Sequence, residues 1–205
     1  MLDVFYPIVP DVTWLQRIVP LGVHTVQLRL KNARNDEIAQ QVRVGLTFCR
    51  AHGCQLIIND HWQAAIDAGG DFIHLGQDDL AAADLAAIRR AGLKLGVSTH
   101  SLAELETALA VRPDYVALGP IYETKLKAMP WAPQGLDRLR EWRARIGQLP
   151  LVAIGGITPD RAAGVLAAGA DSCAVITDFL TAPHPEARVE LWLDWARLAR
   201  RSPGA

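Results

Sequence analysis

Features that would place a protein in a membrane or outside the cell are missing from this sequence. Residues 1–7 have no cationic segment or signal cleavage site, and no apolar run approaches the roughly 20 residues that span a bilayer. The chain has 3 cysteines, without a CxxC pair or a nearby pair of histidines, so neither a disulfide framework nor a zinc site is indicated. We expect a cytoplasmic protein with free, buried thiols.

The sequence also has no excess of charge of one sign. Its 21 Lys and Arg and 22 Asp and Glu residues give a formal net charge of −1, and both signs are scattered along the chain. Such a chain offers no broad cationic face for nucleic acid and no polybasic tract for a membrane surface. Small molecules are therefore the expected partners, and the oligomeric state stays open, with a homo-oligomer as one alternative.

No low-complexity linker or shift in composition divides the chain. Because 205 residues with 50% hydrophobic content can bury one large core, we predict a single domain over residues 1–205, with a frayed tail at 202–205. Short β-type runs alternate with helical patterns throughout. The expected strands are 4–9, 25–31, 56–58, 72–75, 94–100, 114–119, 151–154 and 171–176, and the expected helices are 14–21, 35–52, 62–68, 81–91, 102–111, 136–147, 159–168 and 185–201.

Eight strands that alternate with helices predict a (β/α)8 barrel, in the α/β class. A doubly wound open sheet is the structural alternative, because alternation alone does not show that the sheet closes. Active sites of such barrels lie where the strands end, so the polar residues at the expected strand ends are the candidates for function.

Two of these strand ends carry carboxylates. Asn59 and Asp60 follow one strand, and Asp79 follows the next. Consecutive parallel strands place their carboxyl ends on the same edge, so Asp60 and Asp79 are expected to converge and to suit a hard divalent cation such as Mg²⁺. Each aspartate also has a local explanation as a helix cap.

A strictly alternating strand supplies a polar face of Gln27, Arg29 and Lys31. Inside a barrel or at its mouth these cations would be costly without an anionic ligand. Together with Lys127 on the long irregular loop at 120–134, and with Mg²⁺, they form a pocket suited to a pyrophosphate.

A second anion site is predicted on the other side of the barrel. Gly155-Gly156 follows the seventh strand directly before a helix, and such turns offer backbone N–H groups to a phosphate in many barrels, although a simple tight turn is the alternative. Ile176 and Thr177 follow the eighth strand, and Thr124 lies on the long loop. Two anion sites imply two phosphorylated substrates or one bisphosphate.

Two histidines have ordinary explanations. His74 lies inside a strand and is expected to be a packed core residue. His100 lies near Ser98, but no third group and no GxSxG elbow accompany them, so the sequence does not favour nucleophilic catalysis.

Seven segments, spread in order over nearly the whole chain, carry a further pattern. They are Gln27-Leu-Arg-Leu-Lys31, Asn59-Asp60, His74-Leu-Gly-Gln-Asp-Asp79, Gly96-Val-Ser-Thr-His100, Leu118-Gly-Pro-Ile-Tyr122, Pro133-Gln-Gly135 and Ala153-Ile-Gly-Gly-Ile157. Together these segments resemble the thiamine phosphate synthase family. The family is a (β/α)8 barrel that joins 4-amino-2-methyl-5-hydroxymethylpyrimidine pyrophosphate to 4-methyl-5-(2-hydroxyethyl)thiazole phosphate and releases pyrophosphate, through a pyrimidine cation.

The resemblance implies a role for each candidate residue. Mg²⁺ would be bound by Asp60 and Asp79, and Ser98 would contact the pyrimidine side of the reacting centre. The pyrimidine pyrophosphate would be held by Gln27, Arg29, Lys31, Asn59 and Lys127, with Arg29, Lys31, Ser98 and Lys127 acting in catalysis. The thiazole phosphate would be held by Thr124, Gly156, Ile176 and Thr177.

Three positions depart from the family pattern. His61 replaces the second Asp of an Asn-Asp-Asp run, Leu126 replaces a Thr of the loop, and Asp178 lies beside the proposed phosphate site. Two rival functions follow from the same residues. A thiazole tautomerase resembles the synthase but tends to lose the metal carboxylates and to use a His where this chain has Pro120, and a non-catalytic ligand binder would not need the carboxylate pair.

Overall fold

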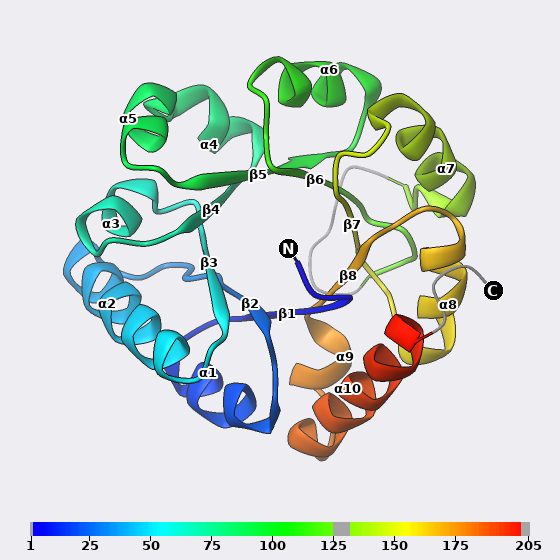
Figure 1. Ribbon diagram of the computed structural model, residues 1–205, viewed down its shortest axis with the longest axis horizontal. Helices are drawn as coiled ribbons and strands as arrows, with labels where there is room; N and C mark the ends of the chain where they lie inside the picture. The colour runs from blue at the N-terminus through cyan, green and yellow to red at the C-terminus, as the bar shows by residue number, and fades with distance from the viewer. Residues whose placement is uncertain (1, 125–131, 202–205) are drawn as a thin grey trace.

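The eight strands of this protein close into one parallel barrel. The computed structural model describes residues 2–124 and 132–201. Neighbouring strands pair in sequence order from β1 to β8, and Phe5 to Pro7 of β1 pair with Cys173 to Val175 of β8. Helices surround this ring of strands (Figure 1). The predicted (β/α)8 barrel is confirmed, and the open-sheet alternative is wrong because the first and last strands are hydrogen-bonded to each other.

Strands and helices alternate along the chain, with a long connection between β6 and α7. The strands are β1 (Phe5–Val9), β2 (Thr25–Leu28), β3 (Gln55–Asn59), β4 (Phe72–Leu75), β5 (Lys94–Thr99), β6 (Tyr115–Leu118), β7 (Leu151–Ile154) and β8 (Ser172–Val175). The helices are α1 (Val12–Ile18), the 3-10 helix η1 (Val19–Leu21), α2 (Asn35–Ala51), α3 (Trp62–Asp67), α4 (Gln77–Ala82), α5 (Leu85–Arg90), α6 (Leu102–Ala110), α7 (Gly135–Ile146), α8 (Pro159–Ala167), α9 (Thr177–Leu180) and α10 (Pro185–Arg201).

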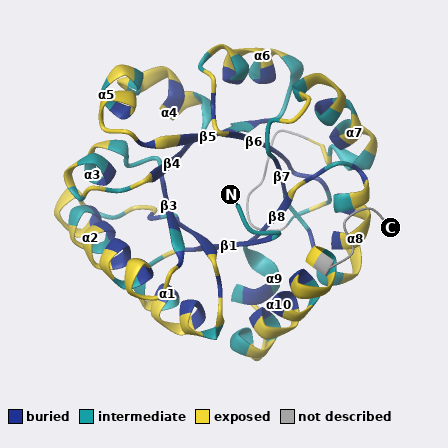
Figure 2. Cartoon of the chain, in the orientation of Figure 1, coloured by how far each residue is buried: buried dark blue, intermediate teal, exposed yellow. Residues whose placement is uncertain are grey.

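Alternation along each strand divides the core into two layers. One set of side chains packs between strands and helices, where Phe5 stacks on Trp192 of α10 with ring centroids 5.1 Å apart. The other set fills the barrel interior. It consists of Tyr6, Ile8, Ile57, Phe72, Tyr115, Ala117, Val152 and Ala174. Figure 2 shows the buried strands at the centre and the exposed residues on the outer faces of the helices.

The expected helix at 81–91 is wrong, because the chain forms two short helices there. Ala83 leaves the helical conformation with ψ of 143°, and the Asp84 side chain accepts a hydrogen bond from Ala87 N at 2.9 Å, which caps the start of α5. Alanine-rich sequence favours helix on both sides of the break, but a capping aspartate starts a new helix rather than continuing the old one.

The strand expected at 25–31 ends at Leu28, so Arg29 and Lys31 lie beyond it. The short helix α9 directly after β8 was not expected. Residues 125–131 and 202–205, which include Lys127, Leu126 and the predicted tail, lie outside the described residues. Within the described part of the chain, no helix is both long and apolar enough to cross a membrane. A cytoplasmic location stays a prediction.

Candidate active site

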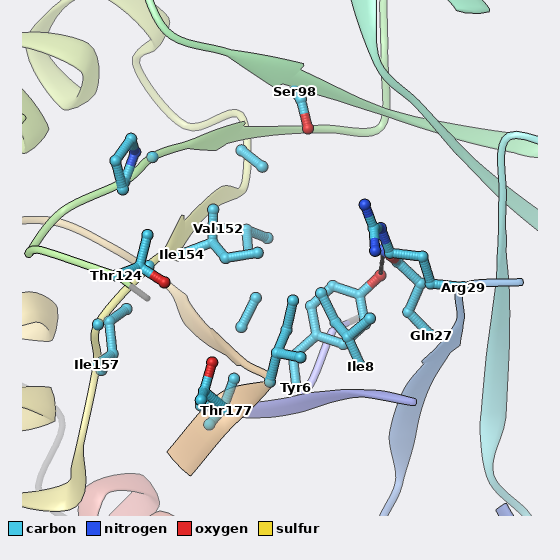
Figure 3. Close-up of a pocket in the computed structure, with 18 of the residues that line it drawn as sticks. Tyr6, Ile8, Gln27, Arg29, Ser98, Thr124, Val152, Ile154, Ile157 and Thr177 are labelled. Atoms are coloured by element: carbon cyan, nitrogen blue, oxygen red, sulfur yellow. Dashed lines mark hydrogen bonds between the residues drawn. The ribbon is translucent and has the colours of Figure 1, made fainter. Parts of the chain in front are cut away.

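A cavity of about 1060 Å³ lies at the carboxyl ends of the strands and reaches down into the barrel (Figure 3). Its walls come from all eight strands or from the segments that follow them. The cavity brings together every predicted site residue that the structure describes. These residues are Gln27, Arg29, Lys31, Asn59, Asp60, Asp79, Ser98, Thr124, Gly156, Ile176 and Thr177.

Asp60 and Asp79 meet at this mouth, as expected. Lys31 Nζ lies 2.6 Å from Asp60 Oδ2 in an ion pair, and Asp79 lies within hydrogen-bonding reach of the Asp60 carboxylate. Burial, followed by the charge and the hydrogen bond of Asp60, raises the pKa of Asp79. Neither aspartate is an N-cap residue, because His61 is the N-cap of α3, and Asp79 lies in the first turn of α4, whose N-cap is Gly76.

The backbone at Asp60 is unusual. Its φ of 64° lies in the left-handed region, which few residues other than glycine adopt readily. The turn is held by hydrogen bonds from Asp60 N to His74 O at 2.9 Å and from Trp62 N to Asp60 O at 2.9 Å. The strand end therefore aims the carboxylate at the cavity at some cost in backbone strain.

His61, one of the three departures from the family pattern, has a structural account. Its Nε2 lies 3.2 Å from the carbonyl oxygen of Leu30. A carbonyl only accepts, so the imidazole donates and links the end of β3 to the segment between Arg29 and Lys31. His61 thus helps to hold the segment that carries both cations.

The oxygen donors at this mouth fit a magnesium ion. Among residues 2–124 and 132–201, no three His, Cys, Asp or Glu side chains gather as a complete metal cage. Mg²⁺ is usually held by one or two carboxylates, with water and substrate phosphate oxygens as the other ligands. Two convergent carboxylates beside Lys31 and Arg29 match that donor set.

Below the mouth, a row of polar side chains crosses the barrel interior. Gln27 Nε2 donates to Tyr6 Oη at 2.8 Å, and Tyr6 Oη lies 3.1 Å from Tyr115 Oη. Tyr115 Oη lies 2.7 Å from His74 Nδ1, and His74 Nε2 lies 2.8 Å from Ser98 Oγ. Figure 3 shows the Gln27–Tyr6 contact on one wall and Ser98 on another.

Burial is the main cause of the pKa shifts of His74, Tyr6 and Tyr115 in this row. It lowers the pKa of His74 to about 4 and raises the pKa of both Tyr6 and Tyr115, so all three are neutral at pH 7. His74 is buried, as the sequence predicted, but it also contacts Ser98. Sequence reasoning missed Tyr6 and Tyr115. The two-residue alternation that points both into the barrel with Ile8 and Ala117 was the available signal.

On the opposite side of the cavity, two glycines are required by close packing. Gly155 and Gly156 have φ of 101° and 64°. A Cβ on Gly155 would lie 2.6 Å from Pro120 Cα, and a Cβ on Gly156 would lie 2.5 Å from Glu123 O. The segment after β6 thus lies directly on this turn. Hydrogen bonds from Ile121 N to Ile154 O at 2.9 Å and from Tyr122 N to Gly155 O at 3.0 Å hold it there.

Asp178 lies on the same side of the cavity. Its negative charge is balanced by a side chain of α10. Its carboxylate accepts hydrogen bonds from Arg188 Nε and Nη2, both at 2.8 Å, and from Trp192 Nε1 at 2.7 Å. These bonds raise the pKa of Arg188. The unexpected aspartate therefore fastens α9 to α10, and its charge is already matched.

Comparison with known proteins agrees with this geometry. The family model described as thiamine monophosphate synthase matches residues 6–179. The chain is 62% identical over 192 residues to a thiamine-phosphate synthase of Rhizobium etli, covering 94% of both chains. It is 50% identical over 186 residues to the thiamine-phosphate synthase of Neisseria meningitidis serogroup A, covering 91% of both.

A solved structure extends the similarity to the fold. A thiamine phosphate pyrophosphorylase from Pyrococcus furiosus superposes with a TM-score of 0.82 at 26% identity, and 95% of each chain is covered. The family predicted from the sequence is confirmed, and the relatives favour a synthase over a thiazole tautomerase. The chain belongs to the thiamine-phosphate synthase family and is a transferase of thiamine biosynthesis built on a (β/α)8 barrel.

Proposed function

We propose that this enzyme joins 4-amino-2-methyl-5-hydroxymethylpyrimidine pyrophosphate to 4-methyl-5-(2-hydroxyethyl)thiazole phosphate, which gives thiamine phosphate and pyrophosphate. One observation carries the proposal. The charged strand ends of β2 to β4 and the glycine turn after β7 line the same cavity. In the ring of strands, β2 to β4 lie across the barrel from β7 (Figure 1). One cavity with two separate anion-binding regions suits two phosphorylated substrates. We also propose that the whole chain acts as one domain.

The first region, here called the pyrimidine side, consists of Gln27, Arg29, Lys31, Asn59, Asp60 and Asp79. Arg29 and Lys31 would bind the pyrophosphate oxygens, because charge-assisted hydrogen bonds to phosphate are among the strongest available in proteins. Gln27 and Asn59 are almost fully buried and would orient the pyrimidine end of the substrate. Lys127, from the loop outside the described residues, would add a further cation.

Asp60 and Asp79 would hold Mg²⁺. When bound there, Mg²⁺ would neutralise part of the charge of the departing pyrophosphate. In the protein without ligand, Lys31 pairs with Asp60 at 2.6 Å. The same lysine would then be available to the pyrophosphate once a cation shares the Asp60 carboxylate.

The second region, here called the thiazole side, consists of Thr124, Gly156, Ile176 and Thr177. Gly156 would offer its backbone N–H, and Thr124 and Thr177 would offer hydroxyl groups, to the phosphate of the thiazole substrate. Leu126 stands where family members carry another threonine, and it lies outside the described residues.

The chemistry needs no protein nucleophile. The bond between the pyrimidine methylene carbon and the pyrophosphate oxygen breaks, and its electron pair leaves with the pyrophosphate. The thiazole nitrogen then gives its lone pair to the resulting pyrimidine cation and forms the new carbon–nitrogen bond. Arg29 and Lys31 would stabilise the leaving charge, Ser98 would contact the pyrimidine side of the reacting centre, and the cavity walls would align the two rings and keep water away.

A product assay tests this function. Purified protein is incubated with both phosphorylated substrates, with and without Mg²⁺, and the products are separated by chromatography. We expect thiamine phosphate and pyrophosphate in equal amounts, and only with Mg²⁺. Isomerised thiazole phosphate in reactions without the pyrimidine would instead indicate a tautomerase. Binding of both substrates with no condensation would indicate a binding protein.

A further inference from the structure

The row of polar groups inside the barrel connects Gln27 of the pyrimidine side to Ser98. It runs from Gln27 through Tyr6, Tyr115 and His74 to Ser98, with successive distances of 2.8, 3.1, 2.7 and 2.8 Å. Every member except Ser98 is buried, with at most 7% of its surface exposed. All five side chains line the cavity, but because so little of their surface is exposed, the neighbours in the row are the main partners of each hydrogen.

Gln27, the first member, determines which group donates and which accepts in every hydrogen bond of the row. The Gln27 amide nitrogen only donates, so the Tyr6 oxygen accepts from it, and the Tyr6 hydrogen turns to Tyr115. The Tyr115 hydrogen then turns to His74 Nδ1, which must be unprotonated. A neutral imidazole with an unprotonated Nδ1 carries its hydrogen on Nε2, and that atom faces Ser98 Oγ.

A doubly protonated imidazole does not fit the same contacts. It would donate to both Tyr115 and Ser98, so the Tyr115 hydrogen would turn to Tyr6. The Tyr6 oxygen would then receive hydrogens from both of its neighbours, Gln27 and Tyr115, and its own hydrogen could be accepted by neither. The neutral ring with its hydrogen on Nε2 satisfies every contact.

We infer that His74 and Tyr115 are positioning residues that make Ser98 accept from the imidazole and turn its own hydroxyl hydrogen into the cavity. The inference rests on the proposed function, which places Ser98 at the pyrimidine side of the reacting centre. Ser98 then meets its ligand as a donor, and the ligand atom opposite it must be an acceptor. A ring nitrogen or a pyrophosphate oxygen fits, whereas an exocyclic amino group does not.

The barrel is shaped to allow this arrangement. Tyr115 lies across the interior over Gly96, where an added Cβ would be only 2.1 Å from the tyrosine ring. The His74 ring stacks on Tyr115 with centroids 5.4 Å apart and an angle of 13° between the planes. A side chain at position 96 would push Tyr115 away from His74 and break the row in the middle.

The tautomer of His74 gives a direct test, measured by ¹⁵N NMR of the ligand-free protein at pH 7. The signals lost in His74→Phe identify the ring among the 6 histidines of the chain. We expect Nε2 protonated and Nδ1 unprotonated. A neutral ring with its hydrogen on Nδ1 would mean that Ser98 donates to His74, which overturns the inference whatever the protein catalyses.

Two variants test whether this orientation matters for the reaction. His74→Phe keeps a ring on Tyr115 but offers Ser98 no donor, and we expect kcat to fall about tenfold with a smaller change in KM, as for loss of one oriented hydrogen bond. His74→Gln can still present an N–H₂ group to Ser98 and should stay within about threefold of the wild-type kcat.

Thr99→Val is the matched control, because it also removes a buried hydrogen-bonding group, at the residue next to Ser98. Thr99 Oγ1 donates to Ala117 O and accepts from Trp142 Nε1, both at 2.8 Å, on the helix side of the barrel. We expect a lower melting temperature and an unchanged kcat. Equal kcat in wild type, His74→Phe and His74→Gln would refute the positioning role. A wild type that forms no thiamine phosphate would refute the proposed function, while the tautomer result would still stand.

Discussion

The pyrimidine side of the mouth is made of ionisable side chains, whereas the thiazole side is made of backbone and hydroxyl groups. On the pyrimidine side, Lys31 pairs with Asp60, and burial together with Asp60 raises the pKa of Asp79. On the thiazole side, Gly155 and Gly156 pack directly against the segment after β6. Asp178, which follows Thr177 on this side, is held by Arg188 and Trp192.

This difference predicts how far each side is formed before its ligand binds. Among the described residues of the pyrimidine side, Lys31 forms an ion pair with Asp60, and an incoming anion and cation would give the charges of this side further partners. The thiazole side is already formed by packing. Substitutions on the pyrimidine side should therefore lower activity more than stability, and those on the thiazole side should lower stability first.

The largest effect is expected from Asp60→Asn. Asparagine keeps the size of the side chain and tolerates the φ of 64°, but it removes the charge that would bind Mg²⁺. We expect kcat to fall by about 10² to 10³, the usual cost of losing one electrostatic contact to the transition state. Initial rates at saturating substrate and Mg²⁺ measure this change, and a thermal melt should show little difference.

Asp67→Asn is the control for Asp60→Asn, because Asp67 is an exposed residue of α3. Its kcat should match that of the wild type. If Asp60→Asn keeps at least half of the wild-type kcat, the carboxylate pair is not the metal site and the contrast between the two sides is lost.

A smaller effect, on stability, is expected from Gly156→Ala. The new methyl group would lie 2.5 Å from Glu123 O, so the segment after β6 must move. Gly92→Ala is the matched control, since Gly92 also has a positive φ, of 72°, but a Cβ there meets no described atom within 4 Å. We expect Gly156→Ala to lower the free energy of unfolding by about 2 kcal/mol more than Gly92→Ala, as overpacking does.

Denaturant unfolding of both glycine variants measures this difference. Equal losses of stability would mean that only the backbone conformation matters and that the turn is not held by packing. A rise in KM for the thiazole phosphate in Gly156→Ala alone would support the proposed phosphate contact.

The smallest effect is expected from Asp178→Ala. The change leaves Arg188 and Trp192 without their shared acceptor, and we expect a loss of about 1.5 kcal/mol in the free energy of unfolding. Asp194→Ala removes an exposed ion pair with Arg197 and should cost much less. Melting temperatures compare the two variants, and a loss as small as that of Asp194→Ala would contradict the fastening role of Asp178.

The sequence predicted the residues whose position depends only on where each strand ends. Strand ends follow from the alternation of patterns, and parallel strands bring their ends to one edge, so the amino-acid sequence was enough to place Asp60 and Asp79 together. The glycine turn and Thr177 were found in the same way. The roles assigned to these residues stay predictions.

Other features depend on one capping residue or on contacts between segments far apart in the chain, which local sequence patterns do not predict. The break between α4 and α5 lies in alanine-rich sequence, where a single capping aspartate decides the outcome. Tyr6, Tyr115 and His74 sit in apolar strands and form a row only because the closed barrel points them at one another. The role of Asp178 depends on α10, whose Trp192 reaches it from 14 positions further along the chain.

The left-handed backbone at Asp60 has a consequence for protein engineering. Glycine adopts a φ of 64° without strain, so Asp60→Gly could be tolerated or even favoured in a screen that selects for thermal stability alone. Such a screen would enrich barrels that fold well and carry no carboxylate at this position. Any stability selection on this enzyme should therefore be paired with growth that depends on thiamine, so that position 60 is retained.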